Sequence, residues 1–180
     1  MIVCLIAAHR RFALPWAATM RTAVLTISTS VASGHNDDVS GLRLAALARD
    51  AGCDVQVHEV LTDDRAVIAA RLRALVADDV AVVLTTGGTG FTPDDHTPEA
   101  TGDVIQRDAP GIAEALRAEG LRHKPHAMLT RGLAGLAGGT LIVNFPGNPK
   151  AIDETFAVLA AVLPHAVATL RRADGQRTGH

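Results

Sequence analysis

The sequence predicts a single α/β domain, a three-layer αβα sandwich around a mainly parallel β-sheet. Three short runs rich in Val, Leu and Ile punctuate the chain, at residues 22–28, 80–85 and 140–144. Helical periodicities lie between and after them, and a chain of 180 residues that is 48% hydrophobic can bury one sizeable core. Strands that alternate with helices form right-handed βαβ units, which put parallel strands in the middle and helices on both faces.

The predicted strands follow from the pattern of their apolar residues. The three runs are almost continuously apolar and are bounded by polar or glycine-containing loops, as is typical of strands buried on both faces. Residues 55–60 alternate at first between apolar and polar, which predicts a half-exposed strand nearer the edge of the sheet.

The predicted helices follow from apolar residues at i, i+3, i+4 and i+7. This spacing places apolar side chains on one face of a helix, which can then cover the sheet. The three sets are Leu44, Leu47, Ala48 and Ala51; Ile68, Leu72, Leu75 and Val76; and Ile152, Phe156, Leu159, Ala160 and Leu163.

The predicted domain covers residues 20–168, with a C-terminal tail at 169–180. Regular patterning begins just after Met20, so residues 1–19 are either an N-terminal extension or the product of a wrong start codon, with Met20 the true start. The first residues place an apolar run before the arginines, the reverse of a signal peptide. No stretch approaches the roughly 18 apolar residues of a membrane span, so we expect no membrane partner.

Composition and charge point to a small ligand. The chain carries 17 Lys and Arg against 19 Asp and Glu, a net charge of -2, and has no basic block that could neutralise nucleic-acid phosphates. Its aromatic content of 3% leaves few rings for base stacking, so nucleic acid is not expected as a partner. Cys4 and Cys53 lack the paired spacing of a zinc site or a disulfide framework, which indicates a reduced, cytoplasmic protein.

The most informative segment is TTGGTGFTPDDHTPEA at residues 85–100. Its residues Thr86, Gly87, Gly88, Thr89 and Gly90, called the glycine loop here, form a backbone free to take positive φ and to turn N–H groups toward an anion. The segment is neither a Walker A loop nor the dinucleotide fingerprint GxGxxG. We interpret it as a phosphate-binding and nucleotide-binding loop of another kind, the alternative being a tight glycine turn.

A helix is expected to begin just after the glycine loop. Thr97 is a good N-cap and Pro98 suits the first helical position, so the positive end of the helix dipole would face the loop. Asp94 and Asp95 lie in between, where bare carboxylates would repel a phosphate unless a divalent cation bridged them. Magnesium is the natural candidate for that cation, and solvated aspartates are the alternative.

A second loop, NFPGNPKA at residues 144–151, also precedes a predicted helix. Asn148 is the expected N-cap, Pro149 the first helical residue and Lys150 part of the first turn, which together make an anion-ready helix start. A lysine at this end opposes the helix dipole, which favours a ligand role for Lys150 over a stabilising one. A plain turn with a solvated lysine is the alternative.

The remaining polar groups have ordinary structural interpretations. Asp38, Ser40 and Gly41 precede the first long helix as a cap, and Asp63 and Asp64 are expected to cap the second. His123 and His126 are three residues apart without a third ligand in view, so a surface loop is favoured over a metal site. Glu114, Arg117 and Glu119 are expected on a solvated helix face.

With DVSG upstream and NFPGNPKA downstream, the segment TTGGTGFTPDDHTPEA resembles the MogA/MoaB family of molybdenum-cofactor proteins, over about residues 22–165. The related CinA and MoeA proteins share the domain, but this chain is too short for their additional domains. The resemblance implies a molybdopterin-binding domain with adenylyltransferase activity, in which ATP and molybdopterin give adenylylated molybdopterin and pyrophosphate with Mg²⁺. It also implies a homotrimer.

The resemblance assigns roles by position. It implies that Asp95 and Asp63 bind the metal and act in catalysis, and that the glycine loop contacts the nucleotide phosphates. It associates two further loops with the pterin substrate, through Pro146, Gly147, Asn148 and Lys150 in one and Asp38, Ser40 and Gly41 in the other.

One residue departs from the family pattern. Members commonly carry arginine immediately before the catalytic aspartate, and this chain carries Asp94 there. The reversed charge weakens anion binding unless magnesium or another residue, such as Arg131, compensates. The alternative function is therefore a MoaB-like protein that binds molybdopterin with little or no catalysis.

Overall fold

The computed structural model describes residues 20–171. The predicted extension at residues 1–19, which includes Cys4, and residues 172–180 of the predicted tail lie outside the described part. The last described helix, α7 (Leu163–Leu170), runs two residues beyond the predicted domain end at residue 168.

A six-stranded sheet forms the centre of the described molecule, in the order β2-β1-β3-β6-β5-β4. The first four of these strands are parallel to one another, while β5 pairs antiparallel with β6 and with β4. The mainly parallel sheet is thus confirmed. The strands are β1 (Arg21–Ile27), β2 (Asp54–Leu61), β3 (Val82–Thr86), β4 (Arg107–Asp108), β5 (Ala134–Ala137) and β6 (Thr140–Phe145).

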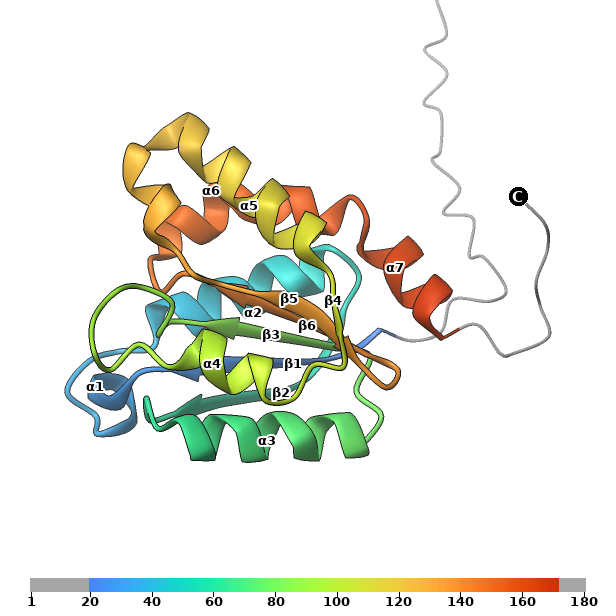
Figure 1. Ribbon diagram of the computed structural model, residues 1–180, viewed down its shortest axis with the longest axis horizontal. Coiled ribbons are helices and arrows are strands. Elements are labelled where there is room, and N and C mark those ends of the chain that lie inside the picture. Colours follow the sequence, from blue (N-terminus) through green and yellow to red (C-terminus); the bar gives the residue numbers. More distant parts are fainter. Residues whose placement is uncertain (1–19, 172–180) are drawn as a thin grey trace, which may run out of the picture.

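Helices cover both faces of the sheet and complete the three layers (Figure 1). One face carries α2, α5, α6 and α7, and the other carries α3 and α4. The short α1 lies beyond the end of β1. The bounds are α1 (Thr29–Ala32), α2 (Val39–Asp50), α3 (Arg65–Ala77), α4 (Thr97–Gly102), α5 (Pro110–His123) with a following 3-10 turn, η1 (Pro125–Leu129), and α6 (Pro149–Ala160).

Alternation along the central strands supplies both cores. Val24 of β1 packs toward α2, α5 and α6, while its neighbour Leu25 packs toward α3, because successive side chains of a strand point to opposite faces. Both side chains are fully buried, as the continuous apolar runs predict. Cys53 is buried within the first core, and this burial raises the pKa of its thiol.

Two sequence predictions need correction. The periodicity of residues 152–163 continues past the end of α6, but the chain breaks at residues 161–162 and starts α7 with Pro164 in its first turn. A proline ring clashes with the carbonyl four residues earlier, here that of Ala160, and so ends the helix. The strands β4 and β5 were not predicted, because two and four residues are too short to show a period.

Within residues 20–171, no single helix is long and apolar enough to span a membrane, and α6 with α7 meets these limits only as a pair bent by 55°.

The chain order of the strands creates a crevice. From β1 the chain passes through α2 to β2 on one side, and from β2 it passes through α3 to β3 on the other side of β1. The loops that follow β1 and β3 therefore diverge at the carboxyl ends of these strands, which is where open α/β sheets bind their ligands. The loop after β6 ends at the same edge, because β6 is parallel to β3.

Candidate functional site

The glycine loop follows β3 and is tied to the neighbouring loops. Gly87 and Gly88 have φ values of 97° and 60°, the left-handed region expected for this segment. A Cβ on Gly87 would collide with the carbonyl oxygen of Ile27 at the end of β1. On the other side, Thr86 Oγ1 donates a 2.9 Å hydrogen bond to the carbonyl of Pro146, after β6. The loop thus lies between the ends of β1 and β6, and Thr86 holds it there.

Thr97 does not cap α4 as predicted. His96 is the residue before the helix, and Thr97 is its first residue. The hydroxyl of Thr97 donates to the carbonyl of Gly87 over 2.8 Å, and its N–H donates to the carbonyl of Gly88 over 3.0 Å. Both acceptors belong to the glycine loop, so this threonine stabilises the loop.

Asp95 closes the turn that follows the glycine loop. Its Oδ2 accepts hydrogen bonds from the N–H and the hydroxyl of Thr92, at 2.8 and 2.5 Å. A Cβ placed on Gly90 would lie 2.9 Å from the same oxygen, so the carboxylate packs directly against the glycine loop.

Asp63 approaches the loop from the opposite side. Its Oδ2 accepts hydrogen bonds from the N–H and hydroxyl of Thr29, at 2.7 and 2.8 Å. The predicted capping role falls to Asp64 alone, whose Oδ1 accepts from the first N–H groups of α3. Asp63 is free of that role because Thr29 holds it, and its Oδ1 lies 3.4 Å from a Cβ placed on Gly88.

Asp63 and Asp95 are the carboxylates that could contribute ligands to a partly hydrated magnesium ion. Asp63 and Asp95 line the same cavity, and the Oδ1 of each makes no hydrogen bond to the described residues, since the threonines bond to Oδ2. Residues 20–171 contain no group of three or more His, Cys, Asp or Glu side chains that could hold a metal. Magnesium suits such a pair, because it usually keeps several waters and binds through one or two carboxylates plus substrate phosphates.

Two cavities meet at the glycine loop. The first, of about 410 Å³, lies between the loop, α5 and α6, and the second, of about 610 Å³, lies between the loop, the end of β1 and the start of α2. Both volumes are in the range of small-molecule sites. The two cavities share four lining residues, Gly87, Gly88, Asp95 and Gly147.

Three of the four residues predicted in the loop after β6 line the first cavity, and Lys150 does not. Asn148 caps α6 by accepting a 2.9 Å hydrogen bond from the N–H of Lys150, and Gly147 approaches so closely that its Cβ would lie 3.2 Å from the Cα of Gly87. Pro146, Gly147 and Asn148 line the cavity. The side chain of Lys150 is 81% exposed and lies outside the lining.

The start of α2 contributes mainly shape. The helix begins at Val39, so Ser40 and Gly41 lie in its first turn and not before it as predicted. Asp38 caps α2 through the N–H of Gly41, accepts from the hydroxyl of Thr26, and lies 2.8 Å from Nε2 of His58. A Cβ on Gly41 would collide with that hydroxyl. Asp38 and Gly41 are thus committed to the fold, whereas Ser40 lines the second cavity.

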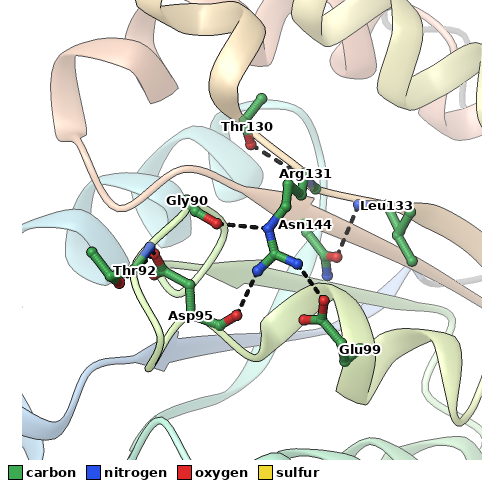
Figure 2. Close-up of polar contacts among 9 residues, drawn as sticks. Gly90, Thr92, Asp95, Glu99, Thr130, Arg131, Leu133 and Asn144 are labelled. Atoms are coloured by element: carbon green, nitrogen blue, oxygen red, sulfur yellow. Dashed lines mark hydrogen bonds and ion pairs between the residues drawn. The ribbon is translucent and has the colours of Figure 1, made fainter.

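Arg131 holds the segment between the glycine loop and α4 (Figure 2). Its Nε donates to the carbonyl of Gly90 over 2.7 Å, one terminal nitrogen donates to the carbonyl of Asp95, and the other pairs with Glu99. The guanidinium therefore lies in a separate hollow on the far side of Asp95. This arrangement corrects the expectation that Arg131 could replace a missing phosphate ligand.

The pKa of Glu99 reflects this contact. Burial raises the pKa of its carboxyl, but the hydrogen bond and charge of Arg131, with a backbone hydrogen bond, outweigh burial and hold the pKa below its ordinary value. Glu99 is therefore ionised at neutral pH and keeps Arg131 in place.

Comparison with known proteins identifies the family and the fold. A family model described as a probable molybdopterin binding domain matches residues 23–165. The chain belongs to the MogA/MoaB family of molybdenum-cofactor biosynthesis proteins. Among relatives of similar length, it is 34% identical to a molybdopterin adenylyltransferase of Helicobacter pylori, covering 83% of this chain and 86% of that protein.

Solved structures of the family agree. A MoaB protein of Thermus thermophilus superposes with a TM-score of 0.80 at 37% identity, covering 84% of this chain and 96% of that one. A Mog protein of Mycobacterium ulcerans gives 0.80 at 36% identity, covering 84% and 99%. Other relatives are longer: the chain is 40% identical to the Drosophila melanogaster molybdenum cofactor synthesis protein cinnamon, over 80% of this chain but only 24% of that protein.

Asp94, the residue at which this MogA/MoaB chain departs from the family pattern, lies outside the lining of both cavities. Asp94 is exposed, whereas Asp95 beside it is half-buried and lines both. The extra negative charge therefore acts on a bound anion through solvent, where salt screens it.

Sequence reasoning missed the contribution of α5. Arg117, predicted on a solvated face, is half-buried, lines the first cavity and donates to the carbonyl of Gly132 over 2.9 Å. Lys124 and His126 line the same cavity, while His123 pairs with Glu119 as a surface residue. The signal was available as a helical stripe of cavity residues, namely Ala113, Leu116, Arg117, Gly120 and Lys124.

Proposed function

We propose that the protein is a molybdopterin adenylyltransferase that uses ATP and Mg²⁺. The observation that carries the proposal is the meeting of Asp63 and Asp95 at the glycine loop, between two cavities that share this loop. Two neighbouring cavities suit a reaction between two bound substrates, and the conversion recorded in the name of the Helicobacter pylori relative is of this kind.

The reaction needs no nucleophile from the protein. A terminal phosphate oxygen of molybdopterin attacks the α-phosphorus of ATP, a new P–O bond forms, and the bond between the α-phosphorus and the bridging oxygen breaks to release pyrophosphate. Bound magnesium would neutralise the charge on the phosphates. The protein orients both substrates and supplies preorganised N–H groups from its glycine loop.

Each carboxylate is positioned for its role by a threonine. Thr92 holds one oxygen of Asp95, and Thr29 holds one oxygen of Asp63, so the second oxygen of each remains for the metal. Because these hydrogen bonds fix the carboxylates before the ligand binds, no reorganisation is needed at the reacting phosphate.

The test compares asparagine variants of three aspartates. Purified protein is given molybdopterin, ATP and Mg²⁺, and pyrophosphate release is measured. Asp95→Asn and Asp63→Asn should each lower the rate at least 100-fold. The loss of a charged group at the reacting phosphates is expected to raise the activation free energy by about 3 kcal/mol. Asp64→Asn is the matched control, because asparagine also caps helices well. A rate that is unchanged in Asp95→Asn contradicts the proposal.

A second candidate is a protein that binds molybdopterin without appreciable catalysis. Asp94 favours it, since this acidic residue replaces the family arginine beside the catalytic position. Molybdopterin binding in isothermal titration, without pyrophosphate release from wild-type protein, would support this candidate over the first.

Homotrimer assembly and a cytoplasmic location belong to the same proposal. Leu121, Met128 and Leu129 expose large apolar side chains at the end of α5 and in η1, which a neighbouring copy would cover. Sedimentation equilibrium should give three times the mass of the chain.

A further inference from the structure

Glu154 of α6 carries an unusual carboxylate on the wall of the first cavity. Its side chain is only 13% exposed, and its Oε2 is buried with no hydrogen-bond partner among the described residues. The nearest cationic atoms, Lys150 Nζ and His123 Nδ1, are both 3.9 Å away, at the outer limit of an ion pair. Burying a carboxylate oxygen without a donor is costly, so such a group needs an explanation, and a missing ligand is one.

The helix itself does not supply the donor. Thr155, the next residue, donates its hydroxyl to the carbonyl of Ala151 over 2.7 Å. The cations that line the cavity from α5 and the turn after it are Arg117, Lys124 and His126, and Arg117 is already bonded to the carbonyl of Gly132. None of the three lies within ion-pair distance of Glu154. Its carboxylate therefore faces a space that something else must fill.

Small residues from facing elements form part of the wall of the same cavity. They include Ala113 and Gly120 of α5, Ala127 of η1 and Ala151 of α6, which lie beside the polar lining residues named above. Gly120 approaches η1 so closely that a Cβ on it would lie 2.9 Å from the Cβ of Ala127. Largely apolar walls with a few placed polar groups are typical of small-molecule sites, and they suit a heterocycle with apolar faces and a polar edge.

Glu154 also lies far enough along α6 from the glycine loop for one ligand to reach both. Asn148, where α6 begins, lines the cavity beside the glycine loop, and Glu154 is six residues further along the helix. At about 1.5 Å per residue, this separates the two positions by roughly 9 Å. A ligand can thus place a ring at Glu154 and a phosphate near the glycine loop.

We propose that Glu154 recognises the pterin ring of molybdopterin by its amino edge, an inference that rests on the proposed function. The amino group at C2 and the N3–H of a pterin are adjacent donors, and a carboxylate offers two acceptors with matching spacing. Since the terminal torsion of a glutamate is soft, both oxygens can turn toward this edge. The carboxylate thereby selects a 2-amino-4-oxo ring over rings with a carbonyl at C2.

The test uses two free rings and no ATP. Pterin carries an amino group at C2, whereas lumazine carries a carbonyl there, which a carboxylate repels. Fluorescence titration should show that wild-type protein prefers pterin to lumazine at least tenfold. In Glu154→Gln the amide can accept from N3–H and donate to the C2 carbonyl, so the preference should reverse, with pterin binding weakened at least tenfold.

A matched control and a second variant keep the test decisive. Glu119→Gln removes a carboxylate that also faces His123 but lies outside the cavity lining, and it should keep the wild-type preference. Glu154→Asp keeps the carboxylate and should keep the preference for pterin at lower affinity, even if Glu154→Gln fails to fold. Equal or undetectable binding of the two rings to wild-type protein, or an unchanged preference in Glu154→Gln, overturns the inference.

Failure of the proposed function has a different signature. Ring binding is measured without ATP, so it does not depend on whether the protein adenylylates molybdopterin. If wild-type protein releases no pyrophosphate but still prefers pterin to lumazine, the adenylylation is rejected and the role of Glu154 stands. Pyrophosphate release with no ring preference would reject the role of Glu154 alone.

Discussion

Replacement of Arg131 by lysine tests whether this residue holds the segment after the glycine loop in shape. The guanidinium donates to the carbonyls of Gly90 and Asp95 while it pairs with Glu99. Lysine keeps the charge, but its single ammonium group lacks the planar fork and can replace at most one of the two backbone contacts.

The magnitude follows from these contacts. A hydrogen bond to a charged group contributes about 1.5–3 kcal/mol, and the lower end applies because the Arg131 side chain is 33% exposed. Losing one to two such bonds lowers the free energy of local opening by about 1.5–3 kcal/mol. At about 1.4 kcal/mol per factor of ten, the loop should open roughly 10 to 100 times more often.

Hydrogen–deuterium exchange measures this opening directly. The amides of Thr92, Asp95 and Thr97 are hydrogen-bonded within the segment, so they exchange only when it opens. Their protection should fall about 10-fold to 100-fold in Arg131→Lys. Protection at the wild-type level in this variant would refute the assignment.

Arg71→Lys is the matched control for this prediction. Arg71 of α3 makes two hydrogen bonds to Glu59 of β2 at 2.7 Å each, and neither residue lines a cavity at the site. Its replacement should leave protection at residues 92–97 unchanged, because the contact lies on another surface. Equal loss of protection in both variants would show that a general loss of stability, and not the contact with the loop, is responsible.

Two further predictions concern stability. Because the folded pKa of Glu99 is lowered from 4.5, its ion pair stabilises the protein above that pH and loses this effect as pH falls through the folded pKa. Glu99→Gln should therefore be less stable than wild type in urea at pH 7, by up to about 1 kcal/mol, and the gap should close in acid; a constant gap would contradict the pairing. Asp64→Ala removes a helix cap and should cost about 1 kcal/mol without slowing pyrophosphate release; a slower reaction would place Asp64 in the site.

The strands that form the crevice could be predicted because buried strands are rich in apolar residues. β1, β3 and β6 are covered on both faces, so nearly every position is buried and most positions carry apolar residues, chiefly Val, Leu and Ile. β5 contains two small alanines and a glycine beside α5, and β4 contains two exposed charged residues. Their pairing depends on β6, and a local window of sequence cannot show it.

The side chains of the site were harder to predict because most polar groups have several possible partners. Thr97 and Asp63 both occupy positions where capping is the local expectation. Thr97 instead bonds to the carbonyl of Gly87 in the glycine loop, and Asp63 to Thr29 of α1. Arg117 was predicted on a solvated helix face, and Glu154, on another helix, carries no local signal of a site. They line one cavity only because α5 packs against α6.

The wall between the two cavities has a consequence for how substrate preference can change. Three of the four residues that the cavities share are glycines, Gly87, Gly88 and Gly147, so main-chain atoms form most of the boundary. Every other lining side chain belongs to one cavity or the other. A mutation of a side chain that lines one cavity can therefore change the specificity for the substrate bound there. The substrate in the other cavity keeps its contacts with the shared main chain, so the two specificities can evolve independently.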